Sequence, residues 1–565
     1  MKTKTIVVAA TMLLATALGN AGEPPKREFR SVWMAAMGID WPMSNCQGTS
    51  ESAKQKAQAA FIEYIENFKR HNFTGICLQV RPLADALYRS TLEPWSASVS
   101  GTRGVDPGWD PLEFAIEECH KRGLELYAWI NPFRIDPNGN IYTTDFDLEW
   151  REKGWELKSG SWTIFNMAIP EARQHCLDVI KEIYTNYQVD GLIFDDYFYP
   201  NDKLTEGSSA GDYQIWKDAK SGLSIADWRR RNVNEFVAEL YEMIQNDRPD
   251  MHYGIGPAGT AGKSAAKHGV KPPTAGDDWQ YDKIYADPLA WLHEGTIDFI
   301  SPQIYWSRSD NNAPYTPIAN WWAYVAEHFG RHNYISMASY KVKETSFGGH
   351  NEKGWNEIVA QIEIGRSNAE DLAPGQIYFS AKQFDGPEYT GLGDWLETYS
   401  YQRPALIPPL TWKEHVEYGA PEGATVDADG KLSWQPVAVP RDNTIMRYSI
   451  YAVPMSHSFE DAMHAGGDGI DGRFLVDISY STEYVLPEKL RKNYWYAVCV
   501  YDGYGFEYAP ATVNYSGERS AATTLLTPGK DTVVDWDAVF TWTEIPGANY
   551  LIEISSLPDF SSVMM

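Results

Sequence analysis

Two adjacent carboxylates, Asp195 and Asp196, are the residues of this sequence best suited to acid–base chemistry. Three aromatic residues, Tyr197, Phe198 and Tyr199, follow them directly. A carboxyl group can donate or accept a proton during bond cleavage, and an aromatic ring can stack on the apolar face of a sugar. The pattern therefore predicts a carbohydrate-active site. The alternative is that the two acids cap the next helix or pair with an arginine.

The acids belong to a stretch, residues 189–200, that begins as a short apolar run bounded by Asp190-Gly191 and by Pro200. Such a run has the composition of a strand in a buried parallel sheet. In a barrel of parallel strands, polar groups at the carboxyl ends of the strands line the active-site mouth. We therefore expect the two acids to lie at such a mouth.

From Phe29 to about Ala381, short apolar strands alternate with amphipathic helices. Eight strand–helix units in one domain predict an α/β fold, the (β/α)8 TIM barrel. A doubly wound open sheet is the alternative, but neither GxGxxG nor a P-loop accompanies the first strand. The predicted strands are residues 30–35, 75–80, 124–130, the apolar start of 189–200, 252–257, 297–306, 334–339 and 376–380. The predicted helices are residues 52–71, 110–122, 170–187, 225–245, 288–294, 321–329 and 355–367.

The pattern changes beyond a proline-rich linker at residues 404–409. Residues 415–518 alternate with period two and resemble a fibronectin type III domain, an all-β immunoglobulin-like sandwich with Trp434 as its core anchor. Residues 520–565 begin a similar pattern and stop about half a sandwich short, which would leave an unpaired edge. We expect either that this partial second sandwich pairs with another segment or that the chain is truncated.

The first 21 residues have the pattern of a secretory signal peptide, with a basic start, an apolar run over residues 6–18 and a small-residue end. The apolar run is too short to span a bilayer comfortably, and no later stretch is apolar enough for a transmembrane helix. We therefore expect an exported protein that does not span the membrane. It would act in the periplasm, at the cell surface or outside the cell.

Composition narrows the possible partners. A net charge of -27 argues against nucleic acid, because phosphate binding needs a basic face. The 22 tryptophans and 34 tyrosines suit a polysaccharide or oligosaccharide partner as well as a large core. The five cysteines are scattered and predict buried free thiols. No CxxC or HExxH spacing suggests zinc, so we expect neither a metal nor a cofactor.

Polar and aromatic residues at the other strand ends complete the predicted site. Each has a structural alternative: loop-bracing ion pairs for the charged residues, a buried hydrogen bond for Gln303 and Tyr305, and core packing for the tryptophans. The predicted substrate-binding residues are Trp33, Arg81, Asn131, Arg134, Tyr197, Gln303, Tyr305 and Trp306. Further candidates at the same strand ends are Asp40, Asp85, Tyr340 and Lys341.

Six short motifs stand in order along the predicted barrel, at residues 79–82, 85–88, 94–96, 129–134, 195–200 and 301–306. Their sequences are QVRP, DALY, PWS, WINPFR, DDYFYP and SPQIYW. Together they resemble the glycosyl-hydrolase-like 10 family over residues 27–405. The resemblance implies a TIM-barrel glycoside hydrolase found in bacterial envelopes. At least one bacterial member of that family is a peptidoglycan glycosidase that prefers glycan strands stripped of stem peptides.

The strand that carries the acids also resembles the fourth-strand motif of the chitinase-like family 18 enzymes, Asp-Gly-x-Asp-x-Asp-Trp-Glu. Asp195 matches the last aspartate of that motif. Ile193 replaces its middle aspartate, and Tyr197 replaces its catalytic glutamate. Asp196 is the nearest carboxyl group that could substitute for that glutamate.

The sequence is consistent with two catalytic mechanisms. In the first, one aspartate of the pair is the general acid, and its pKa is raised by the other's charge and by the aromatic rings. The substrate's own 2-acetamido group is then the nucleophile, oriented by the second aspartate and Tyr305. In the second, the partner carboxylate comes from a loop, with Asp40, Asp85 or Asp287 as candidates. We prefer the first mechanism, which requires N-acetylated sugars.

The sequence thus predicts a secreted glycosidase that cleaves a polysaccharide, with an N-acetylated envelope glycan such as peptidoglycan strands as the expected substrate. One alternative is a non-catalytic carbohydrate-binding protein that has kept the barrel and lost the acid. Another is a lytic transglycosylase, which needs a single acid.

Overall fold

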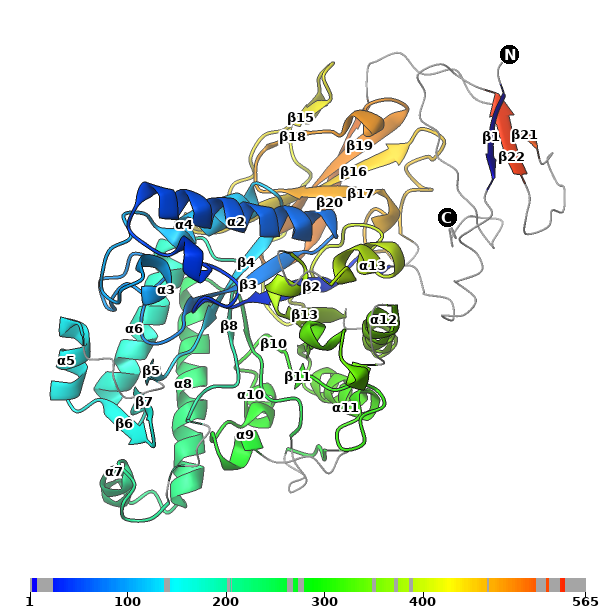
Figure 1. Cartoon of the computed structure of the whole chain (residues 1–565). Coiled ribbons are helices and arrows are strands. Elements are labelled where there is room, and N and C mark those ends of the chain that lie inside the picture. The colour runs from blue at the N-terminus through cyan, green and yellow to red at the C-terminus, as the bar shows by residue number, and fades with distance from the viewer. Residues whose placement is uncertain are drawn as a thin grey trace.

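Figure 1 shows the computed structural model of the chain, which describes residues 3–7, 24–136, 143–200, 204, 206–261, 268–272, 279–347, 352–369, 374–385, 390–464, 467–514, 525–527 and 539–543.

A closed barrel of parallel strands forms the larger part of the molecule, which confirms the predicted TIM barrel. The sheet runs β2, β3, β4, β8, β9, β10, β12, β13 and returns to β2, with β11 continuing the position of β10 along β12. The strands are β2 (Phe29–Met34), β3 (Gly75–Arg81), β4 (Glu125–Ile130), β8 (Gly191–Phe194), β9 (His252–Ile255), β10 (Phe299–Ile300), β11 (Gln303–Ile304), β12 (His332–Met337) and β13 (Gly375–Phe379).

All eight predicted strand positions are occupied, although the sixth is split into two short pieces. Pro302 lies between the pieces and has no N–H to donate to a neighbouring strand, so the ladder is interrupted there. Its carbonyl still accepts a hydrogen bond from the Ser336 N–H of β12 (3.0 Å).

Helices surround the barrel close to their predicted positions. Helix α11 begins earlier than predicted and contains Pro317 in its first turn. Proline is tolerated there because the N–H groups of the first turn make no intrahelical hydrogen bond. The helices that surround the barrel are α2 (Glu51–Arg70), α4 (Pro111–His120), α6 (Pro170–Asn186), α8 (Ile225–Asp247), α10 (Pro288–Glu294), α11 (Tyr315–His328), α12 (Glu352–Ser367) and α13 (Leu392–Tyr399). Further helices are α3 (Ala97–Ser100), α7 (Tyr213–Ala219) and α9 (Trp279–Asp282).

An insertion between β4 and α6 adds structure beside the barrel mouth that the sequence patterns did not predict. It contains α5 (Asp145–Glu152) and a small antiparallel sheet in the order β5 (Arg134–Asp136), β7 (Trp162–Phe165) and β6 (Glu156–Ser159). Because β5 follows β4 after three residues, this sheet is held close to the strand ends.

Aromatic rings fill the barrel interior at the end where the strands begin. The ring of Phe29 stacks on that of Tyr334 with centroids 4.5 Å apart and meets that of Tyr127 edge-on at 5.1 Å. The Phe299 ring lies 5.0 Å from that of Tyr334. A Cβ at Gly191 would lie 2.3 Å from the Tyr127 ring, so only glycine leaves room for this layer.

After the barrel, the described residues contain two antiparallel sheets, in the orders β14-β15-β18 and β17-β16-β19-β20. Both sheets contribute to one buried apolar cluster, which includes Trp434 and Val498, so they pack face to face. The strands are β14 (Thr425–Val426), β15 (Lys431–Ser433), β16 (Met446–Pro454), β17 (Leu475–Ser479), β18 (Glu483–Val485), β19 (Tyr494–Asp502) and β20 (Glu507–Asn514).

The four-stranded sheet covers the end of the barrel where the strands begin, and Figure 1 shows it there (yellow and orange). Leu406, Tyr451 and Tyr501 belong to the same apolar cluster as the aromatic layer of the barrel interior. The Tyr480 hydroxyl donates to Asp190, just before β8, at 2.8 Å. The barrel mouth therefore lies at the opposite end, away from this sheet.

The chain termini contribute a separate three-stranded antiparallel sheet of β1 (Thr3–Val7), β22 (Val539–Thr543) and β21 (Leu525–Thr527). The rest of the predicted signal peptide and most of residues 520–565 lie outside the described residues. Within the described part of the chain, no helix combines the length and the apolar character needed to cross a membrane. All five cysteines are free and buried.

A buried ion pair between the barrel and Lys413, which lies just after the linker, generates the first prediction. Lys413 Nζ lies 2.8 Å from Asp298 Oδ2 and also donates to the carbonyls of Pro249 and Met251. The substitution Lys413→Met leaves Asp298 charged and unpaired in the interior. We expect it to lower the free energy of unfolding in urea by about 3–5 kcal/mol.

The matched control is Lys431→Met, which removes an exposed ion pair with Glu483 (2.7 Å) and should cost less than about 1 kcal/mol. Equal, small losses in the two variants would show that the Lys413 ion pair does not stabilise the barrel.

Candidate active site

Asp195 follows the last residue of β8 and is almost completely buried. The Asn131 amide donates to both carboxylate oxygens at 2.7 Å, the Trp129 indole donates at 3.2 Å, and the Tyr197 N–H donates at 3.1 Å. Burial, the largest effect, raises the pKa of Asp195, while the nearby Arg134 charge and these hydrogen bonds lower it. Because Asn131, Trp129 and the Tyr197 N–H all donate to Asp195, these hydrogen bonds favour its ionised form.

Asn131 is itself held in one orientation. Its Oδ1 accepts a hydrogen bond from Gln79 Nε2 at 2.7 Å, and Gln79 Oε1 accepts from the Ala36 N–H at 3.0 Å. The amide nitrogen of Asn131 must therefore face Asp195. Gln79 was quoted in a family motif but was not predicted as a site residue. A polar residue within the apolar run of β3 is the signal that could have identified it.

Asp196 is half-buried and turns to the other side of the mouth, where it hydrogen-bonds to the Gln303 side chain. Gln303 is anchored by a hydrogen bond from its Nε2 to the Gly256 carbonyl (2.8 Å). Burial first, and then the negative charge of Asp195, raise the pKa of Asp196 to about 7. The two acids thus differ in environment, and burial beside Asp195 favours the protonated form of Asp196.

Arg134 and two aromatic rings form one wall beside the acids. Its guanidinium carbon lies 3.4 Å from the Tyr197 ring centroid and 4.7 Å from that of Trp162 in β7. The positive charge of Arg134 lowers the pKa of both Asp195 and Asp196. A shallow depression runs along this wall and is lined by Arg134, Trp162 and Tyr197. Trp162 was not predicted because the inserted sheet was not.

Tyr305 lies at the other side of the mouth with two further rings. The ring centroids of Tyr340 and Phe379 each lie 6.0 Å from that of Tyr305. Lys341 Nζ donates to the Tyr305 carbonyl at 2.9 Å. Burial, followed by the charge of Asp196, raises the pKa of Tyr305 well above its usual value, so its hydroxyl keeps a proton to donate. Trp306 follows on the chain and is half-buried.

Two predicted substrate-binding residues lie beneath the mouth instead. Trp33 is 2% exposed, and its indole donates to Ser336 Oγ (2.9 Å), so the core-packing alternative describes it. Arg81 is fully buried and pairs with Glu93, and it donates to the Asn131 carbonyl at 2.6 Å. Arg81 is therefore the loop-bracing ion pair of the alternative interpretation, and it acts on the site through Asn131.

The loop carboxylates considered as partners have structural roles. Asp40 is fully buried and accepts from the Ser380 hydroxyl (2.9 Å) and from two backbone N–H groups. Asp85 lies 3.4 Å from Arg103. Asp287 caps the N-terminus of helix α10. These contacts already engage the three carboxylates, which makes a loop nucleophile hard to supply.

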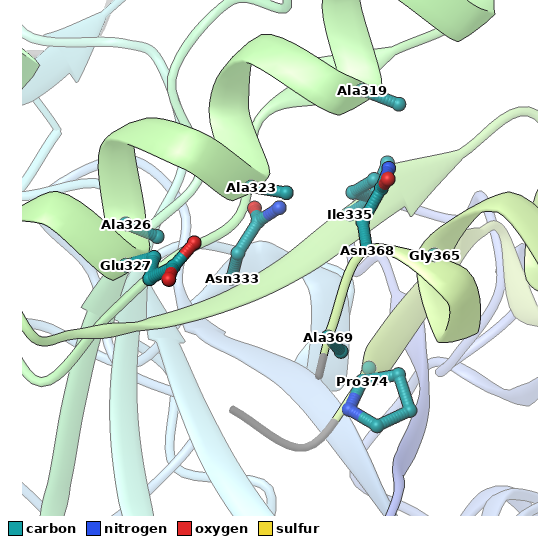
Figure 2. A pocket seen from close by; sticks show the side chains of 11 residues that line it. Ala319, Ala323, Ala326, Glu327, Asn333, Ile335, Gly365, Asn368, Ala369 and Pro374 are labelled. Atoms are coloured by element: carbon teal, nitrogen blue, oxygen red, sulfur yellow. The ribbon is translucent and has the colours of Figure 1, made fainter. Parts of the chain in front are cut away.

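Two other features of the described residues were considered as sites. The cavity in Figure 2 lies between α11, β12 and α12 on the outside of the barrel, and small side chains such as Ala319 and Ala323 line it. His71, Asp394 and Glu397 form the one cluster within the described residues whose possible metal-ligand atoms lie within 4.8 Å. Arg70 already pairs with Asp394 (2.7 Å) and approaches Glu397 (3.8 Å), so a cation there is not needed.

A parallel barrel with two carboxyl groups and several aromatic rings at its mouth is the architecture of a glycoside hydrolase. The chain belongs to the glycosyl hydrolase-like 10 family, which matches residues 28–357. This membership confirms the predicted enzyme class, and the substrate is a carbohydrate.

Named relatives agree with this assignment. The chain is 35% identical over 418 residues to Glycosyl hydrolase YngK of Bacillus subtilis (strain 168), covering 72% of this chain and 78% of that protein. It is 33% identical over 332 residues to Glycosyl hydrolase DigH of Escherichia coli (strain K12), covering 56% and 74%. The solved glycoside hydrolase domain of PgaB (BpsB) from Bordetella bronchiseptica aligns with a TM-score of 0.42 and 15% identity, covering 66% and 99%.

The hydrogen bonds of Gln79 generate the second prediction. The substitution Gln79→Leu keeps the size of the side chain but frees the Asn131 amide to turn away from Asp195. We expect turnover of a glycan substrate to fall by about a hundredfold, which is the loss typical when a catalytic-site group is misplaced by about 1 Å. Stability should fall by about 1–3 kcal/mol, because the buried Ala36 N–H loses its acceptor.

The control is Gln376→Leu. Gln376 is a buried glutamine on β13, and its Oε1 accepts a hydrogen bond from the Tyr401 hydroxyl (2.8 Å). The control variant should lose similar stability and keep its turnover. Full turnover in the Gln79 variant would mean that Asn131 does not depend on this bond.

Proposed function

We propose that the chain hydrolyses glycosidic bonds with Asp196 as the general acid. The observation that carries this proposal is the raised pKa of Asp196, about 7, on a half-buried carboxyl group beside the buried Asp195. A general acid must hold its proton at working pH and release it to the leaving oxygen, and a pKa near 7 suits both.

We further propose that the substrate's 2-acetamido group supplies the nucleophile. Adjacent residues place both carboxyl groups on the same strand end, whereas a protein nucleophile must face the acid across the scissile bond, about 5 Å away. The acetamido oxygen bonds to the anomeric carbon while the bond to the leaving oxygen breaks, and that oxygen takes the Asp196 proton. Asp196 then accepts a proton from the water that opens the cyclic intermediate.

In this mechanism Asp195 and Tyr305 orient the acetamido group. The Asp195 carboxylate can accept from the acetamido N–H, and the protonated Tyr305 hydroxyl can donate to its oxygen. Asn131 would hold Asp195, and Gln303 would hold Asp196 or a sugar hydroxyl. Arg134, Tyr197 and Trp306 would line the sugar path.

The proposed substrate is an N-acetylated cell-envelope glycan such as peptidoglycan strands. The acetamido mechanism requires N-acetylated sugars, and the family resemblance extends to envelope glycans. We also propose that residues 1–21 direct export to the periplasm or cell surface. The proposed domains are a hydrolase over residues 27–405, a fibronectin III-like sandwich over 415–518 and a partial second sandwich over 520–565. Seven antiparallel strands in two packed sheets support the first sandwich.

Mass spectrometry of reaction products tests this function. Glycan strands, both with and without stem peptides, would be incubated with the protein, alongside chitin oligomers and a plant polysaccharide. Hydrolysed fragments from the N-acetylated substrates alone support the proposal. Products with anhydro ends would identify the protein as a lytic transglycosylase, a class of enzyme that needs only one acid. Binding with no product would assign a carbohydrate-binding protein.

The acid pair gives the third prediction. We expect Asp196→Asn and Asp195→Asn each to cut turnover by about a hundredfold to ten-thousandfold, because each removes a proton-transfer or orienting group. Urea unfolding should show that both variants stay folded. Asp287→Asn is the control, because asparagine also caps helices well and should leave turnover unchanged. Near-normal turnover in both pair variants would exclude these residues.

The charge of Arg134 gives the fourth prediction. Activity should fall as the pH rises through about 7, because Asp196 then loses the proton that it donates. Arg134 lowers the pKa of Asp196, so Arg134→Met should raise that pKa and move the alkaline limb of kcat/KM to higher pH. Arg89→Met, an exposed arginine paired with Asp106, should leave the limb in place. A shift to lower pH would contradict the assignment.

A further inference from the structure

We propose that the seam between the barrel and the C-terminal sheets holds a second saccharide-binding site, apart from the barrel mouth. A cavity of about 280 Å³ opens there. This is close to the lower end of the range for small-molecule sites, roughly 300 Å³, so it suits one end of a glycan. It is lined by the turn after α8 (249–250), by the segment that follows the linker (414–418), and by two segments of the sheets (440–444 and 502–504).

The walls of this seam cavity are fixed before any ligand binds. The His415 ring stacks on Phe506 with centroids 3.8 Å apart. Arg441 Nη1 donates to the carbonyls of Asn246 (2.8 Å) and Asp247 (2.9 Å) at the end of α8. A site that is already rigid loses little conformational entropy on binding, so these contacts favour a ligand.

The lining offers the groups that a sugar needs. Tyr418 and Tyr504 present aromatic rings, and neither phenolic hydroxyl has a hydrogen-bond partner among the described residues. Asp502 accepts from the Tyr508 hydroxyl (2.7 Å) and the Phe506 N–H (2.8 Å), which leaves lone pairs for sugar hydroxyls. Rings for the apolar face and acceptors for the hydroxyls together favour a saccharide.

Charge disfavours other ligand classes. Glu414 and Asp502 outnumber the single cation of the lining, Arg441, so a phosphate group would be repelled. A metal ion is also a poor fit. Asp250 is already neutralised by Arg248, whose Nε and Nη2 each lie 3.1 Å from its carboxylate oxygens.

This inference rests on the glycoside hydrolase class and not on the acetamido mechanism. The seam cavity lies at the end of the barrel opposite the acids, so a sugar bound there takes no part in the chemistry. It would instead hold a long glycan near the enzyme. Short substrates should therefore not depend on it.

Hydrogen–deuterium exchange followed by mass spectrometry tests the proposal. The Asp196→Asn variant of the full chain, which prevents turnover, would be mixed with peptide-free glycan fragments or with chitin tetramers. We expect protection of residues 414–418 and 502–504. Adding Tyr418→Ala and Tyr504→Ala should abolish that protection and leave protection at residues 195–200. Tyr324→Ala, an exposed tyrosine on α11, is the control and should change neither.

The outcomes separate this site from the proposed function. Protection at the seam without protection at the mouth would support the site and count against the proposed substrate. Protection confined to the mouth, or no protection anywhere, would overturn the site. Seam protection that survives the double tyrosine substitution would also overturn it. In the otherwise native chain, the double variant should cleave short oligomers at the normal rate and bind long strands at least tenfold more weakly.

Discussion

The burial of one carboxylate, Asp195, is the constraint on which the barrel mouth depends. A buried carboxylate needs hydrogen-bond donors, and Asn131 and Trp129 supply them. Asn131 in turn needs Gln79 to fix its amide, and Arg81 to hold its backbone. A buried polar group without a hydrogen-bond partner costs about 1–3 kcal/mol, and more when it is charged. Substitution of any member of this network should therefore be destabilising. Burial and, after it, the same charge of Asp195 raise the pKa of the neighbouring acid, Asp196.

The closed end of the barrel supports this arrangement from below. A layer of aromatic rings fills the interior where the strands begin, and the four-stranded sheet continues the same apolar cluster. Trp33 links the two levels, because its ring meets Trp129 edge-on at 4.9 Å and Trp129 donates to Asp195. The C-terminal four-stranded sheet thus shares a hydrophobic core with the barrel. An independent module joined by a flexible linker would not share a core in this way.

Apolar runs that alternate with amphipathic helices were enough to predict all the barrel strands and to predict that the acid pair follows the fourth of them. They could not tell which strand residues face the interior, so Trp33 and Arg81 were predicted at the mouth although both lie beneath it. The inserted sheet has strands of three or four residues, too short for a periodic signal, and Trp162 was missed with it. The division of roles within the pair depends on side-chain directions, which adjacent sequence positions do not encode.

The most direct test of the central claim compares two leaving groups in the Asp196→Asn variant. An N-acetylhexosaminide with a dinitrophenol leaving group needs no proton, whereas an N-acetylated oligosaccharide does. If Asp196 is the general acid, kcat/KM of the variant falls about a hundredfold or more on the oligosaccharide and stays close to normal on the aryl substrate, because kcat/KM reports only the step that breaks the glycosidic bond. Equal losses on both substrates would contradict the assignment and give Asp196 a different role.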